Sequence, residues 1–118
     1  MNASEFVASI RTQVLESATE GTITNLQHPP GRRPASSLVS LSQWFNALSV
    51  IDQERVREVA ALASHGAVFG FLAVLDGVRV IEVSPEKGKL ELWYVKGDQT
   101  NLVNDANAPL LHDILQQR

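Results

Sequence analysis

The sequence contains no cysteine. This absence excludes disulfide bonds, iron–sulfur clusters, thiolate zinc sites and cysteine nucleophiles together. Histidine is scarce as well: His28, His65 and His112 are the three in the chain, and no two of them lie within one helical turn of each other. We therefore expect no metal ion and no bound cofactor. A chain without disulfides suits a reducing compartment, so we expect a cytoplasmic protein.

An excess of charge of one sign is also missing. The net charge is −3, and residues 1–63 carry five basic and six acidic side chains against five and seven in residues 64–118. Proteins that bind nucleic acid usually carry a basic face, so we expect no nucleic-acid partner. The most apolar run, residues 67–75, is shorter than the roughly 20 residues that cross a bilayer, and the first residues do not resemble a signal peptide. We expect no membrane partner.

Known catalytic motifs do not occur in the sequence. It has no glycine-rich phosphate loop, no dinucleotide-binding glycine pattern, no H-E-x-x-H arrangement and no nucleophile elbow around a serine. No catalytic residue is therefore named, and the sequence favours a protein that is not an enzyme. An enzyme that assembles its site from distant residues stays open as an alternative.

Length and composition predict one globular domain. The chain has 118 residues, of which 44% are hydrophobic and 19% charged. A chain of this length buries enough surface to fold without a metal or a disulfide. We expect a single domain over residues 1–118, with a long loop at residues 22–37. The loop contains "NLQHPPGRRPASS", whose prolines and glycine disfavour both a helix and a central strand.

Helices are expected on both sides of this loop. Asn2 and Glu5 have the spacing of a capping box, and the apolar residues that follow recur every three to four positions up to Ala18. Two further helices are expected between residues 37 and 63, the second of them beginning near Asp52. Pro109 is expected to open a final helix.

The longest apolar stretch, "HGAVFGFLAVLDGVRVIEV" at residues 65–83, has two interpretations. Asp76-Gly77 between apolar runs is typical of a two-residue turn, which would make the stretch a β-hairpin. Alternatively, residues 66–75 form a helix that ends at Gly77, with small side chains on one side and large ones on the other. The helix is preferred, and both interpretations stay open.

The segments "VRVIEV" (residues 78–83) and "LELWYV" (residues 90–95) are predicted to pair as antiparallel strands. We prefer the register that pairs Pro85 with Leu90, because it avoids placing two glutamates opposite each other. A third strand is expected through residues 100–103. The predicted fold class is therefore α+β: a small antiparallel sheet packed by the N-terminal helices and a C-terminal helix.

One face of the predicted hairpin is too apolar to meet water alone. Burial of an aromatic side chain as large as tryptophan removes about 150–250 Å² from solvent, so something is expected to cover this face. The cover is either the protein's own loop or helix, or a partner: another protein, or a second copy of the chain in a homodimer. The partner interpretation predicts a binding surface made of Val78, Val80, Trp93 and Val95.

Arg32 and Arg33 offer a second candidate site. Guanidinium groups bind phosphate and carboxylate in a bidentate manner, so this pair in the proline-rich loop could clamp an anion. A solvated loop is the plainer interpretation.

Three functions follow from these observations. The preferred one is a small protein-binding module, such as an immunity-type or antitoxin-like neutraliser, or a subunit of an assembly. The first alternative is a protein that binds a small anionic or apolar ligand, with Arg32, Arg33 or Arg79 as its anchor. The second alternative is an enzyme without a recognisable motif.

Overall fold

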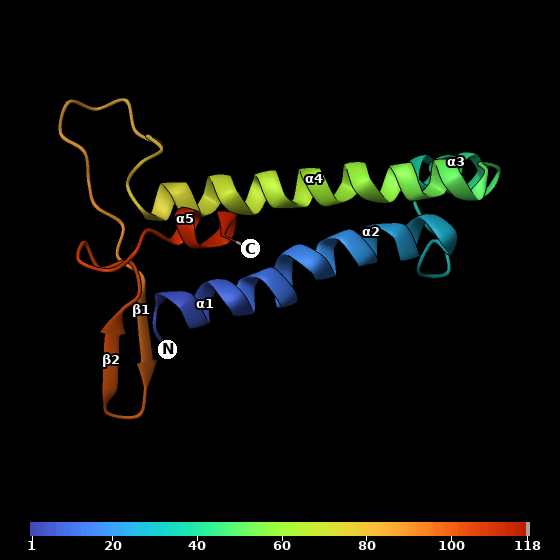
Figure 1. The fold of residues 1–118 in the computed structure, drawn as a ribbon. Coiled ribbons are helices and arrows are strands. Elements are labelled where there is room, and N and C mark those ends of the chain that lie inside the picture. Colours follow the sequence, from blue (N-terminus) through green and yellow to red (C-terminus); the bar gives the residue numbers. More distant parts are fainter. Residues whose placement is uncertain (118) are drawn as a thin grey trace. The chain divides into compact units, whose positions relative to one another are not determined.

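The computed structural model describes residues 1–117 and shows mixed helix and strand (Figure 1). The predicted α+β class, with a small antiparallel sheet, is confirmed. The chain forms two compact units. One is continuous, Val14–His65, and the other combines Met1–Gln13 with the chain from Gly66 onward. The single domain over residues 1–118 stays a prediction.

The first helix, α1 (Ala3–Ile10), begins at the predicted capping box. The backbone N–H of Glu5 donates to Oδ1 of Asn2 at 2.9 Å, and the backbone N–H of Asn2 donates to Oε1 of Glu5 at 3.4 Å. Helical structure continues through a π-helical segment, Arg11–Glu16, into α2 (Ser17–Gln27). These two hydrogen bonds confirm the predicted capping box and the helix that follows it.

The irregular segment is shorter than the predicted loop at residues 22–37. α2 passes through Gly21 without ending, and its last hydrogen bond runs from the N–H of His28 to the carbonyl oxygen of Thr24 at 2.9 Å. A single glycine costs a helix about 1 kcal/mol and does not by itself stop one. The chain leaves the helix only where consecutive prolines follow, and α3 (Ser36–Asn46) begins soon after them.

The unit Val14–His65 is built from α2, α3 and the first part of α4 (Val50–Leu75). Asn46 of α3 donates from Nδ2 to the carbonyl oxygen of Gln27 at 3.1 Å, and Arg57 of α4 forms an ion pair with Glu20 of α2. The hydrogen bond to Glu20 is the main cause that raises the pKa of Arg57. The hydrophobic core of the unit Val14–His65 consists of Ile23, Leu26 and Phe45, with Leu48 and Val56 packed against them.

Helix α4 resolves the two interpretations of residues 65–83 in favour of the helix. It runs without a break from Val50 to Leu75, so the expectation of one helix that ends by residue 63 and a separate one over residues 66–75 is wrong. Gly77 has φ of +75° and ends the helix in a Schellman motif: its N–H donates to the carbonyl oxygen of Val74, and the N–H of Val78 donates to that of Ala73, both at 3.0 Å. Asp76-Gly77 is a helix end and not a hairpin turn.

Helix α4 is also the one helix among residues 1–117 that is long and apolar enough to cross a membrane. Of its most apolar 18 residues, 17% are buried. A core helix of a soluble protein meets the same requirement of length and composition. The cytoplasmic location and the absence of a membrane partner stay predictions.

The sheet lies further along the chain than predicted. Strand β1 (Trp93–Lys96) pairs antiparallel with β2 (Gln99–Leu102), with Trp93 opposite Leu102 and Val95 opposite Thr100. The expected strand at residues 78–83 and its pairing with residues 90–95 are wrong, because residues 78–92 form no strand. The third strand expected at residues 100–103 becomes β2, the second strand of the sheet.

A tight turn explains this pairing. Only Gly97 and Asp98 separate the strands, and Gly97 has φ of +59°, which suits the first central position of a type II′ turn. Such a turn matches the twist of its flanking strands, whereas the predicted hairpin needed a four-residue loop next to Pro85. The nearest pairing therefore replaces the more distant one.

The second unit buries apolar residues from α1, α4, the segment after β2 and the short helix α5 (Leu111–Gln116). Arg11 joins both ends of this unit, because its Nη2 donates to the carbonyl oxygen of Leu115 and, at 3.4 Å, to that of Gln117. The buried residues of this unit are Ala3, Val7, Leu72, Ala73, Val103, Leu111 and Leu115.

Candidate interaction site

The outer edge of β1 carries backbone groups that the sheet does not use. The N–H of Val103 donates to the carbonyl oxygen of Leu92 at 2.8 Å. Hydrogen-bonded and non-hydrogen-bonded pairs alternate along an antiparallel ladder. The pairs of Trp93 with Leu102 and of Val95 with Thr100 are therefore the non-hydrogen-bonded ones. The N–H and C=O groups of Trp93 and Val95 consequently point away from β2.

The side chains of the same two residues add an apolar surface to this edge. Side chains alternate along a strand, so Trp93 and Val95 lie on one face of the sheet. Trp93 is 51% exposed and Val95 is 64% exposed. Their cross-strand neighbours on that face are Leu102 and Thr100. The edge therefore combines open backbone groups with exposed apolar side chains at one place.

The other two residues of the predicted surface, Val78 and Val80, are exposed but lie outside the sheet. They belong to the irregular segment 78–92 that follows α4. The four residues were grouped because side chains alternate along a strand, and this reason holds only for Trp93 and Val95. The partner-binding role of the whole set stays a prediction.

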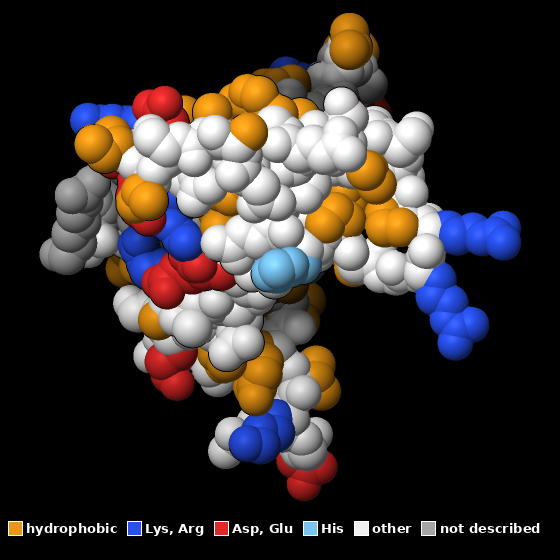
Figure 2. All heavy atoms as spheres, turned by 90° about the vertical axis from the view of Figure 1, so that its right-hand side faces the viewer, with side chains coloured by type: hydrophobic (Ala, Val, Ile, Leu, Met, Phe, Trp, Pro, Cys, Tyr) orange, Lys and Arg blue, Asp and Glu red, His pale blue; other side chains and the backbone are white. Residues whose placement is uncertain are grey.

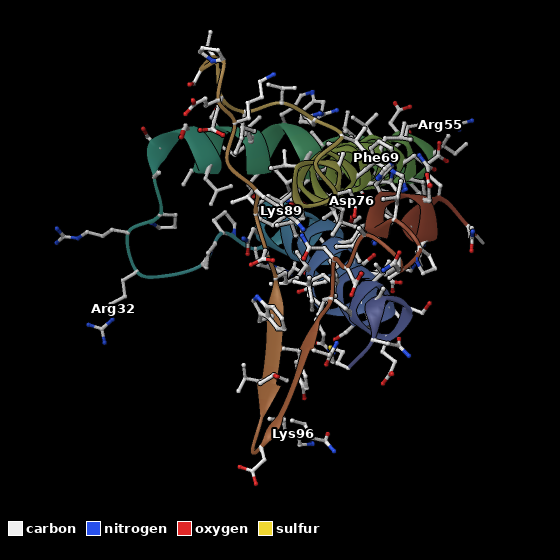
Figure 3. All side chains as sticks on the ribbon, turned by 90° about the vertical axis from the view of Figure 1, so that its left-hand side faces the viewer. Arg32, Arg55, Phe69, Asp76, Lys89 and Lys96 are labelled. Atoms are coloured by element: carbon white, nitrogen blue, oxygen red, sulfur yellow. The ribbon has the colours of Figure 1, made fainter. Side chains whose placement is uncertain are left out.

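Arg32 and Arg33 lie in the exposed loop between α2 and α3. Figure 3 shows the side chain of Arg32 extending away from the ribbon, and Figure 2 shows basic side chains standing clear of the surface. Neither arginine makes a hydrogen bond or an ion pair with residues 1–117. A clamp for an anion at this loop stays a prediction.

Asp76 is a buried carboxylate in contact with a histidine, although the sequence indicated it only as part of a possible turn. Its side chain is 2% exposed, and it contacts Nδ1 of His112 at 2.6 Å. The same carboxylate accepts the backbone N–H groups of Leu111 and His112, both at 2.9 Å. His112 packs edge to face against Phe69, with ring centroids 5.3 Å apart. Figure 3 labels Asp76 and Phe69 near the end of α4.

This arrangement is accounted for by structure. The first N–H groups of a helix have no partner within the helix, and a carboxylate there also interacts favourably with the helix dipole. Asp76 supplies α5 with the hydrogen-bond acceptors and with the negative charge, although it lies outside that helix. The second ring nitrogen of His112, Nε2, lies 3.4 Å from Oδ1 of Asp113, so the imidazole ring lies between two carboxylates. The hydrogen bonds of Asp76 to the first N–H groups of α5 make it a cap for that helix.

Asn104 holds together the segments that precede the sheet. Its Nδ2 donates to the carbonyl oxygens of Leu75 at 2.7 Å and Leu90 at 2.9 Å, and its Oδ1 accepts the N–H of Leu92 at 2.9 Å. One side chain thus ties the end of α4 to the chain that enters β1. Nothing in the local sequence around Asn104 indicates such distant partners.

Within residues 1–117, no cluster of three or more histidine, aspartate or glutamate side chains could hold a metal ion. No protein-family model, curated protein or solved structure matches this chain.

Proposed function

We propose that this chain is a small protein-binding module that receives a β-strand of its partner along the outer edge of β1. The observation that carries the proposal is the coincidence of two features at Trp93 and Val95: outward backbone groups and exposed apolar side chains. A neutralising protein and an assembly subunit could both use such an edge.

The physical support is the weakness of a hairpin left alone. Two strands are marginally stable in water, and a further strand supplies hydrogen bonds to unpaired backbone groups. In recognition by strand addition, main-chain hydrogen bonds provide affinity and alternate side chains provide specificity. Tryptophan is enriched among the residues that dominate binding energy at interfaces. Trp93 is placed to be such a residue.

The edge carries only part of the usual protection against pairing: β1 is short and has one lysine, but it has no proline. Natural edge strands are often blocked by proline, by a bulge or by an inward-pointing charge. The sequence of β1 is WYVK, with Lys96 at its last position as the sole charge. Lys96 lies at the tip of the hairpin, as Figure 3 shows, and leaves the edge at Trp93 and Val95 open.

A matched pair of proline variants tests the proposal. Val95→Pro removes one outward N–H from β1 without breaking the β1–β2 ladder. Thr100→Pro makes the same change directly opposite, on the outer edge of β2. Trp93→Ser removes the aromatic side chain. Each tagged protein is crosslinked in lysate of the source organism, and captured proteins are quantified by mass spectrometry, with circular dichroism as the check on folding.

The proposal expects one protein to be captured in stoichiometric amount by the wild type and by Thr100→Pro. It expects Val95→Pro and Trp93→Ser to lose that protein at least about tenfold, the effect of roughly 1.4 kcal/mol of binding free energy. Capture that is equal for both proline variants would contradict binding at β1. Capture of nothing by the folded wild type would contradict the proposed function itself.

A further inference from the structure

A pocket of about 560 Å³ lies beside the end of α4, within the unit that contains the sheet. Its walls come from the last turn of α4, from the irregular segment that follows it, and from the chain near Asn104. Ligand pockets for small molecules measure about 300–1,000 Å³ and are mostly apolar with a few polar groups. The apolar part of the wall is made of Val74, Leu75, Val80, Ile81 and Leu90.

The charged part of the wall is mainly basic. Arg79, Lys87 and Lys89 line the pocket, and none of them forms an ion pair or a side-chain hydrogen bond with residues 1–117. This concentration is notable in a chain whose net charge is −3. Figure 3 shows Lys89 on the segment that passes near the end of α4.

The two carboxylates in the wall are already engaged. Oε2 of Glu82 accepts the backbone N–H of Gly88 at 2.8 Å, and both oxygens of Asp76 accept groups from α5. Glu86 and Glu91 belong to the same stretch of chain but do not line the pocket. The wall therefore carries three basic side chains against two carboxylates, and neither carboxylate forms an ion pair with any of the three basic groups.

The position of Arg79 depends on a glycine. A Cβ atom added at Gly70 of α4 would collide with Nη1 of Arg79, so the guanidinium lies against the bare backbone of the helix. Gly70 is itself buried, whereas a Cβ at Gly66 would meet nothing within 4 Å. The absence of a side chain at position 70 thus leaves the space that Arg79 occupies at the edge of the pocket.

The backbone acceptors at this end of α4 are also satisfied. The carbonyl oxygen of Leu75 accepts Nδ2 of Asn104, and those of Ala73 and Val74 accept N–H groups of the Schellman motif. Free carbonyl oxygens at a helix C-terminus would disfavour an anion. Here these three carbonyl oxygens accept hydrogen bonds, which reduces their repulsion of an anion, and the cationic groups of the wall are Arg79, Lys87 and Lys89.

We propose that this pocket binds a small amphipathic anion. A carboxylate or phosphate head would be held by Arg79 together with Lys87 and Lys89, because charge-assisted hydrogen bonds to these groups are the strong ones. The apolar body would lie against the wall formed by α4 and Ile81. This site is separate from the edge of β1 and does not depend on the protein-binding proposal.

Titration calorimetry with eight-carbon probes tests the ligand class. Octanoate and octyl phosphate carry the two candidate heads on the same tail, and octyltrimethylammonium reverses the charge. The proposal expects millimolar or tighter binding of at least one anion and at least about tenfold weaker binding of the cation. The anion that binds more tightly, octanoate or octyl phosphate, identifies the preferred head group. A wild-type protein that binds neither anion, or that binds the cation equally well, would overturn the proposal.

Two matched pairs of variants locate the binding. Arg79→Met keeps the apolar stem and removes the charge, and Lys96→Met makes a comparable change at the distant tip of the hairpin. Gly70→Ala displaces the guanidinium, and Gly66→Ala adds the same methyl group where there is space. Arg79→Met and Gly70→Ala are expected to weaken binding about three- to tenfold, and their controls less than twofold. Equal affinity across either pair would place the anion elsewhere and overturn the site.

Discussion

Asp76 and His112 are 36 positions apart in the chain and meet at 2.6 Å, which joins the end of α4 to the start of α5. The contact unites two helix ends through one carboxylate. Asp76 follows the last turn of α4 and at the same time accepts the first N–H groups of α5. A helix as short as α5 would be marginal alone, since isolated helices need about 12–15 residues to form.

Removal of this carboxylate is expected to release α5. Asp76→Ala leaves the part-buried N–H groups of Leu111 and His112 without an acceptor, and the free energy of unfolding should fall by about 1–3 kcal/mol. Asp76→Asn keeps one side-chain oxygen and should lose less. Urea denaturation measures both variants, and hydrogen exchange should show the loss first at Leu111 and His112. Equal stability of Asp76→Ala and the wild type would contradict the capping role.

Asn104 is expected to act as a clamp. Asn104→Ala removes the acceptor of Leu92 N–H and the donor to the carbonyl oxygens of Leu75 and Leu90. The loss of these bonds should lower the free energy of unfolding by about 1–3 kcal/mol. Asn104→Asp keeps the acceptor and removes the donor, so it separates the two parts. Faster exchange of the Leu92 amide in the alanine variant, but not in the aspartate variant, is the expected pattern.

A glycine inside α4 and a glycine just beyond its end should respond to alanine in opposite directions. Gly66 lies inside α4 with open space around it, so Gly66→Ala should stabilise the protein by about 0.5–1 kcal/mol. Gly77 has φ of +75°, where a side chain costs about 1–2 kcal/mol, so Gly77→Ala should destabilise it. Thermal denaturation of both variants checks the assignment. A stabilising Gly77→Ala would contradict the Schellman ending of α4.

The protein is expected in the soluble fraction of cells despite the apolar character of α4. Five charged side chains lie in the first nine residues of that helix, and its last part contributes Leu72 and Ala73 to the core. Fractionation followed by a carbonate wash of the membranes measures the location. Protein that resists the wash would show that α4 spans a bilayer.

The local signals of the sequence predicted the helices better than the sheet. The capping box at Asn2 and Glu5 and the glycine end at Gly77 depend on neighbouring residues, so they can be read from a short window. The strand prediction for residues 78–83 failed because these residues have β-forming side chains but no strand pairs with them. The actual hairpin had a signal that was passed over: Gly97-Asp98 between "WYVK" and "QTNL" is a two-residue turn.

The candidate sites were predictable only in part. Trp93 and Val95 could be named because alternation places neighbours two apart on one face. Asp76 and Asn104 could not, since their partners lie 12 to 36 positions away along the chain and no sequence period connects them. Arg79 was named as an anchor for a ligand, but its contact with the backbone at Gly70 emerges only from the fold.

The reach of Arg11 to the carbonyl oxygen of Leu115 has a consequence for synthesis of the chain. The unit Val14–His65 is continuous, so its core can form as soon as those residues leave the ribosome. The other unit needs residues from both ends, and α1 must wait for α5 to be translated. Proteolysis of stalled nascent chains should therefore show Phe45 protected before Val7. The residues of α1 are therefore made before those of the unit Val14–His65 and are expected to pack after them.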